Sequence, residues 1–163
     1  MQTAAADPFQ SLLAVVDRYR NDVHNLRAPA TEEAVASARS NLTQPIPRSL
    51  MRFLHRWNGA VLFRGVLQIR SVNELAAAAE HVPDVIVFAD GPLESDHWAY
   101  APDAHGDAVF GRWTGELFEP LHEDFQSWLA ATIQILDNNI RDPEARFQTR
   151  LDADPNSGFL LLQ

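Results

Sequence analysis

The hydrophobic period of the chain changes abruptly at the pair Asn58 and Gly59. Before this pair, Leu50 and Phe53 recur at the spacing of one face of a helix. After it, residues 60–63 read Ala-Val-Leu-Phe, a run that is typical of a β-strand. Because Asn-Gly strongly favours the end of a helix, we predict a helix that leads directly into a strand.

Segments with helical and strand-like patterns follow one another in a clear order. Helices are expected over about 7–26, from Thr31 to the prolines at 45 and 47, over 48–57, over about 72–81 and over about 119–139. Short strands are expected at 60–63, 66–69, 85–89, 98–102, 108–113 and 115–121. Most helices therefore come first, closely spaced strands follow, and a long helix closes the pattern.

This order predicts an α+β fold with a small, mainly antiparallel sheet packed against N-terminal and C-terminal helices. Turn-forming residues separate the strands by short intervals, which is typical of hairpins. At 163 residues the chain has the length of one domain. We assign residues 1–140 to that domain and residues 141–163 to a C-terminal tail, which either docks on the domain or begins a further region.

Negative charge is concentrated in one part of the chain. Residues 84–124 contain ten acidic residues and one arginine, so this window alone carries the formal net charge of −9. A surface of this sign repels phosphate groups and attracts positively charged proteins. We therefore expect a basic protein partner and no direct binding of nucleic acid.

Several classes of chemistry have no signature in the sequence. There is no cysteine, which excludes disulfides and cysteine-based zinc sites and fits a cytoplasmic protein. No apolar run approaches the roughly 20 residues that span a bilayer, and no signal peptide is recognised, so we expect no membrane association. Phosphate-binding and nucleophile motifs are absent. We expect neither enzymatic activity nor a cofactor.

A hydrolytic or metal-binding site is a lesser alternative. His97 and His105, with Asp96 and Asp107, would form it if they approached one another across a hairpin. None of the six histidines has the spacing of an HExxH motif. Solvated turn residues are the favoured interpretation, and no bound metal is expected.

The acidic window and one aromatic residue supply the candidates for partner contact. The predicted partner-binding residues are Asp90, Glu94, Asp96, Asp103, Asp107 and Trp113. The first three lie in one predicted loop, and the next two lie in the following turn. Because alternate hairpin connections emerge at opposite ends of an antiparallel sheet, the two sets need not form one patch. The 90–96 loop is favoured, and the tryptophan is a candidate for an exposed interface residue.

The stretch IPRSLMRFLHRWNGAVLF resembles the signature of the SUKH superfamily, the Smi/Knr-type domain. In that family a helix begun by proline ends in Asn-Gly and leads into the first strand. The resemblance continues in order through SVNELAAAAE, VIVFADGPLESDHWAYAPD, DAVFGRWTGE and HEDFQSWLAATI, and it covers about residues 31–136. The chain departs from the family at Ala60, where a second glycine is usual, and at Ala89, where the strand often reads Phe-Gly.

The resemblance implies a SUKH-like fold and a partner-binding module without enzymatic activity. Many bacterial members are immunity proteins that neutralise toxins, often nucleases, and a nuclease needs a basic surface to hold phosphates. Immunity to a basic toxin through an acidic surface is therefore our leading hypothesis, with a toxin domain as the partner. A regulatory or adaptor domain at the front of a longer chain is the alternative. The partner's identity and the oligomeric state stay open.

Overall fold

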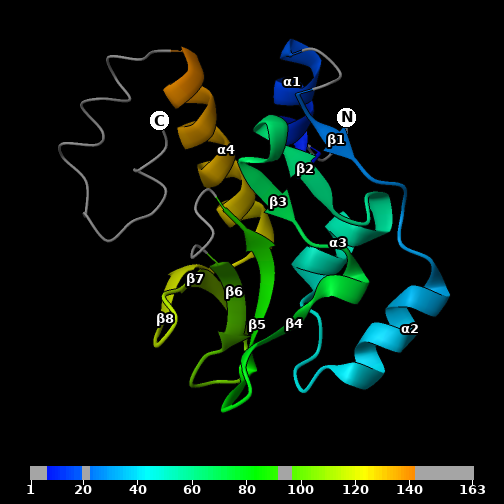
Figure 1. The fold of residues 1–163 in the computed structure, drawn as a ribbon, viewed down its shortest axis with the longest axis vertical. Coiled ribbons are helices and arrows are strands. Elements are labelled where there is room, and N and C mark those ends of the chain that lie inside the picture. Colours follow the sequence, from blue (N-terminus) through cyan, green and yellow to red (C-terminus); the bar gives the residue numbers. More distant parts are fainter. Residues whose placement is uncertain (1–6, 20–22, 92–96, 142–163) are drawn as a thin grey trace, which may run out of the picture.

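The sheet of this protein is antiparallel throughout the region that the structure describes, and helices pack against it (Figure 1). The computed structural model describes residues 7–19, 23–91 and 97–141. Within these ranges, four α-helices and eight strands form an α+β fold, which confirms the predicted class. No helix in these ranges combines the length and the apolar character that a membrane crossing requires.

The elements follow one another in the order that Figure 1 shows. The helices are α1 (Gln10–Arg18), α2 (Glu32–Asn41), α3 (Arg48–Arg56) and α4 (Phe125–Arg141). The strands are β1 (Asn25–Leu26), β2 (Ala60–Leu62), β3 (Leu67–Ile69), β4 (Ala76–Ala79), β5 (Val82–Asp90), β6 (His97–Pro102), β7 (Ala108–Trp113) and β8 (Phe118–His122). Short 3-10 turns lie at η1 (Phe63–Gly65) and η2 (Val72–Glu74).

Strand β5 is the centre of the sheet. The strand order is β1-β2-β3-β5-β6-β7-β8, and β4 also pairs with β5. Strand β3 pairs with Ala89 and Asp90 near the end of β5, whereas β4 pairs with its first part. β6 runs along the other edge of β5. Two short strands therefore share one edge of the longest strand, one at each end.

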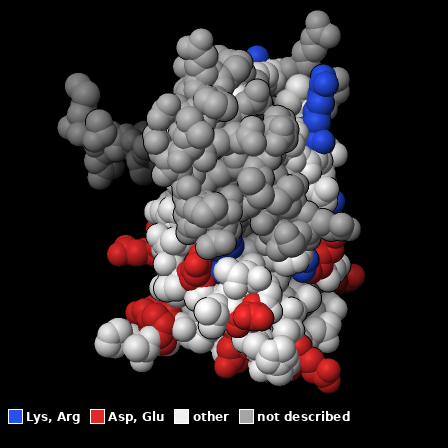
Figure 2. Space-filling model, turned by 60° about the vertical axis from the view of Figure 1, so that its left-hand side comes forward, with Lys and Arg blue, Asp and Glu red and all other residues white. Residues whose placement is uncertain are grey.

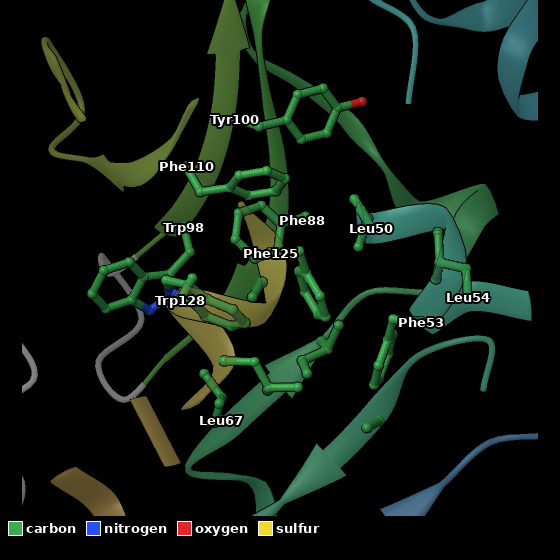
Figure 3. Close-up of a cluster of buried hydrophobic side chains, with 14 of the residues drawn as sticks. Leu50, Phe53, Leu54, Leu67, Phe88, Trp98, Tyr100, Phe110, Phe125 and Trp128 are labelled. Atoms are coloured by element: carbon green, nitrogen blue, oxygen red, sulfur yellow. The ribbon is translucent and has the colours of Figure 1, made fainter. Parts of the chain in front are cut away.

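The main core lies between the helices and one face of the sheet. Alternate side chains of a strand point to the same face, and Phe88, Tyr100 and Phe110 reach this core from β5, β6 and β7. The helices contribute Phe53 and Trp128, which Figure 3 shows among the strand residues. The Phe88 and Trp128 ring centroids are 4.7 Å apart at an interplanar angle of 84°, an edge-to-face geometry that aromatic pairs prefer.

A smaller apolar cluster occupies the opposite face of the same strands. It consists of Val85, Val87, Ala99, Ala101 and Trp113. Both faces of β5 are therefore buried over residues 85–89, which explains the continuous apolar run Val-Ile-Val-Phe-Ala. The prediction of a buried strand there is confirmed.

The pair Asn58 and Gly59 joins α3 to the sheet as the sequence predicted. The Asn58 amide donates to the Ala28 carbonyl at 2.8 Å, and its side-chain oxygen accepts from the Val72 amide at 2.7 Å. Gly59 has a φ of +95°, and a Cβ there would lie 2.8 Å from the Ile69 carbonyl oxygen. Only glycine satisfies both conditions without strain, so this pair ends the helix and lets the chain cross closely over β3.

The helix predicted over 72–81 is wrong. The capping box of Ser71 and Glu74 is present, but it opens only the single turn η2. The alanines that follow form β4, where Ala76 and Ala77 pair with Val87 and Ile86 of β5. Pairing with β5 satisfies the backbone hydrogen-bonding groups of this segment. The free energy gained from this pairing exceeds the intrinsic helix preference of alanine.

Two other predicted helices have different bounds in the structure. The helix predicted over 7–26 is limited to α1, and residues 25 and 26 form β1, which pairs with β2. The last helix begins at Phe125 and not near 119, because residues 118–122 pair with β7 as strand β8. The α2 prediction is confirmed, since the Thr31 side chain accepts from the Ala34 amide at 3.1 Å.

Truncating Phe53 should strongly destabilise the protein. Its side chain is fully buried and its ring packs against Phe9 and against Phe125 of α4, so Phe53→Ala should lower the free energy of unfolding by about 3–5 kcal/mol. Leu117 is 69% exposed, and Leu117→Ala should change it by no more than about 0.5 kcal/mol. Urea unfolding with an unchanged slope checks both values. A similar loss in the two variants would contradict the assignment of the core.

Candidate functional site

The structure places the predicted acidic residues at opposite ends of β6. Asp90 is opposite His97, the first residue of β6, whereas Asp103 and Asp107 lie in the turn that follows the strand. At roughly 3.3 Å per residue, the six-residue strand separates its two ends by about 17 Å. The two acidic sets therefore do not form one patch, as the hairpin argument anticipated. Glu94 and Asp96 lie outside the described residues.

Asp90 belongs to an ion-pair network within this chain. The Arg70 guanidinium donates two hydrogen bonds to its carboxylate, from Nε at 2.7 Å and from Nη2 at 2.8 Å. His97 Nδ1 lies 2.8 Å from the same carboxylate. Burial raises the pKa of Asp90, but hydrogen bonds from Arg70 and His97 lower it by more, so the net pKa is below its ordinary value. This carboxylate is thus satisfied by Arg70, which follows β3, and by His97 of β6.

The predicted exposure of Trp113 is wrong. Its side chain is 4% exposed and packs in the smaller apolar cluster with Val87 and Ala99. β7 continues through this residue, which is opposite His97 on one side and Phe118 on the other. Because side chains alternate between the two faces of a strand, β7 directs the indole toward the smaller apolar cluster. The sequence alone suggested an exposed residue next to the turn.

The alternative metal or hydrolytic site is not assembled by this fold. His97 faces Asp90 at one end of β6, and His105 and Asp107 lie in the turn at its other end. Asp96 lies outside the described residues. In the part of the chain that is described, no three His, Asp or Glu side chains are close enough to hold a metal ion.

The β6–β7 turn is shaped by one of its two acidic residues. The Asp103 carboxylate accepts hydrogen bonds from the amides of His105 at 2.8 Å and Asp107 at 3.0 Å. Its own amide donates to the Asp107 carbonyl at 2.7 Å. Among the described residues, none pairs with the exposed carboxylate of Asp107. The turn therefore presents that charge to solvent.

A groove of about 320 Å³ lies beside this turn. Residues 44–47, from the connection between α2 and α3, and Arg48, the first residue of α3, form one wall, and residues 100–102 and 106–108 form the other. The connection is fixed to β5, because Gln44 Nε2 donates to Asp84 Oδ1 at 3.0 Å and the Thr43 hydroxyl donates to the Pro83 carbonyl. The sequence analysis missed this groove, since its walls are more than 50 residues apart in the chain.

Three exposed carboxylates lie on or beside the groove: Asp107 lines it, Asp103 is hydrogen-bonded to the Asp107 amide, and Asp84 is hydrogen-bonded to Gln44 of the opposite wall. We call Asp84, Asp103 and Asp107 the acidic rim. One positive side chain, Arg48, also lines the groove. Figure 2 shows that acidic side chains gather over the lower part of the described surface, and the turn between β6 and β7 lies at the lower end of Figure 1. The local charge balance at the groove is therefore negative.

Tyr100 lines the same groove from the sheet. The residue is 1% exposed, and its hydroxyl has no hydrogen-bond partner among the described residues. Burial raises the pKa of this hydroxyl well above its ordinary value, so it stays protonated at neutral pH. A neutral phenol both donates and accepts hydrogen bonds. It is a buried polar group beside an open space.

Comparisons with family models and with curated proteins identify no relative. No model of a known protein family matches the chain, and no curated protein matches it at a significant level. The resemblance to the SUKH superfamily stays a prediction from the sequence.

Removing the Asp90 charge should destabilise the fold. Asp90→Asn leaves Arg70 without its anionic partner, and the free energy of unfolding at pH 7 should fall by about 1–3 kcal/mol. Because the folded pKa lies below the unfolded value of about 3.9, the carboxylate stabilises the protein above that pH, and the gain is lost as the pH falls through the folded pKa. The difference from the wild type should therefore shrink in acid.

Asp107→Asn is the matched control. It removes the same charge from a carboxylate without a partner among the described residues, so it should change stability by no more than about 0.5 kcal/mol at any pH. Chemical denaturation between neutral and acidic pH measures both variants. Equal losses in the two variants would contradict the assignment of the Asp90 network.

Proposed function

We propose that this protein is a non-enzymatic binding module that contacts a basic protein through the acidic rim. The observation that carries the proposal is the carboxylate of Asp107, which is exposed beside a groove and unpaired within the described residues. Asp84 and Asp103 add two negative charges around it. Charge of one sign around a concave surface accelerates association with an oppositely charged partner and rejects partners of the same sign.

The acidic rim replaces the 90–96 loop as the proposed contact surface. Asp90, the described acidic residue of that loop, is paired with Arg70 and His97. A carboxylate that already holds two partners gains little from a third and would lose stability if it released them. The Asp107 carboxylate has no such partners among the described residues. Its charge is available to a partner at no cost to the fold.

The narrower role that we propose is immunity to a basic toxin in the cytoplasm. The support for this role is the sequence resemblance to the SUKH superfamily together with the sign of the rim. A nuclease surface that holds phosphates is positively charged, so an acidic inhibitor is complementary to it. A regulatory or adaptor role would use the same rim with a different basic partner.

Removing two charges of the acidic rim should weaken partner binding. The double variant Asp84→Asn, Asp107→Asn keeps the size of both side chains and removes two charges. Immobilised wild-type protein should capture a basic protein from a lysate of the source organism, identified by mass spectrometry. With that protein purified, calorimetry at several salt concentrations should show binding about tenfold weaker in the variant, with a flatter salt dependence.

A control variant with the same net charge as the double rim variant separates the effect of the acidic rim from the effect of the protein's overall charge. Asp17 and Glu116 are exposed and lie in α1 and in the β7–β8 turn, away from the groove. The double variant Asp17→Asn, Glu116→Gln should bind like the wild type. Unchanged affinity and salt slope in the rim variant, or equal weakening in the control, would overturn the proposal.

A further inference from the structure

We infer that the groove beside the acidic rim receives a lysine or arginine side chain of the basic partner. The inference rests on the proposed function and names the group that the partner would insert. It follows from three properties of the groove: its charge balance, the apolar surface of its walls and the buried hydroxyl beside it.

The charge balance favours a cation over an anion. An anionic group would be attracted by Arg48 but repelled by Asp107 on the groove wall and by the carboxylates of Asp84 and Asp103, which are hydrogen-bonded to lining residues. A cation has the opposite preference, and the Asp107 carboxylate on the groove wall offers it an acceptor without a competing partner in the described chain. An ion pair formed there loses water on one side only, so its desolvation cost is moderate.

The apolar lining fits the stem of such a side chain. Pro45 and Ile46 lie on one wall and Pro102 on the other. Lysine and arginine carry three or four methylene groups, which pack on apolar surface while the charged end reaches a polar group. Arg48 at the start of α3 then remains for a main-chain carbonyl of the same partner segment, because its guanidinium is a donor only.

Tyr100 supplies a second acceptor for the inserted group. Figure 3 shows its ring at the edge of the aromatic cluster, with the oxygen directed away from the other labelled rings. This hydroxyl is buried and has no hydrogen-bond partner among the described residues. Tyr100 itself lines the groove. A guanidinium or ammonium carries several N–H donors, so a group bound to the Asp107 carboxylate keeps further donors for the Tyr100 oxygen.

The test uses two short peptides that differ in one charge. The probe is acetyl-Gly-Arg-Gly-amide, and its control replaces arginine with citrulline, which has nearly the same shape and no charge. Two-dimensional NMR of the full chain follows the backbone amides of Arg48 and Gly106 on the two walls. The arginine peptide should shift both amides in a saturable way, and the citrulline peptide should bind about tenfold more weakly.

Two variants assign the contacts. Asp107→Asn should weaken binding of the arginine peptide about tenfold, whereas Glu116→Gln, which removes a distant charge, should leave it unchanged. Tyr100→Phe removes a hydroxyl that has no partner in the described structure, so the variant should fold normally and bind the peptide several-fold more weakly.

The outcomes separate this inference from the proposed function. Equal binding of both peptides, shifts away from the two walls, or no saturable shift would overturn the groove assignment. If the full partner still depended on the acidic rim in that case, the proposed function would stand without the groove. If arginine peptide bound in the groove but no partner depended on the rim, the groove assignment would stand and the proposed function would fall.

Discussion

The fold depends on the contact between α3 and α4 over the centre of the sheet. The ring centroids of Phe53 and Phe125 are 5.0 Å apart, and those of Phe125 and Phe88 are 5.8 Å apart, so the three rings connect both helices to β5. The Phe125 amide also donates to the Ser49 hydroxyl at 3.1 Å. Because α3 is fixed in this way, the segment before it is held opposite the β6–β7 turn. The groove is thus a consequence of core packing.

Local patterns in the sequence were sufficient for some elements and not for others. The pair Asn58 and Gly59 ends α3 as the local residue pattern predicts, although the hydrogen bonds that hold it reach Ala28 and Val72, which no local pattern shows. Ala76 and Ala77 differ, since alanine carries no strand signal and their conformation is decided by pairing with β5. The sequence predicts the wrong structure there because the decisive interaction is between strands and not within one segment.

The candidate site was even harder to predict from local sequence patterns. The sequence identified an acidic window, but charge alone does not distinguish Asp90 from Asp107. The difference is made by Arg70, which lies 20 residues from Asp90 in the chain and reaches it only when β3 pairs with β5. The groove requires residues 44–48 to meet residues 100–108, a contact that no local pattern encodes. Sequence reasoning found the charge, and the tertiary structure determines which charge is available.

The hydrogen bonds of the acidic rim do not account for its charge. Asp84 accepts from Gln44, and Asp103 accepts from two amides of its turn, but an asparagine oxygen would accept the same bonds. Asp107 accepts no side-chain bond from the described residues at all. Three carboxylates held around one groove repel one another, which opposes the compact state. These bonds therefore leave the negative charge to solvent, where it adds to solubility and is open to the basic partner that we propose.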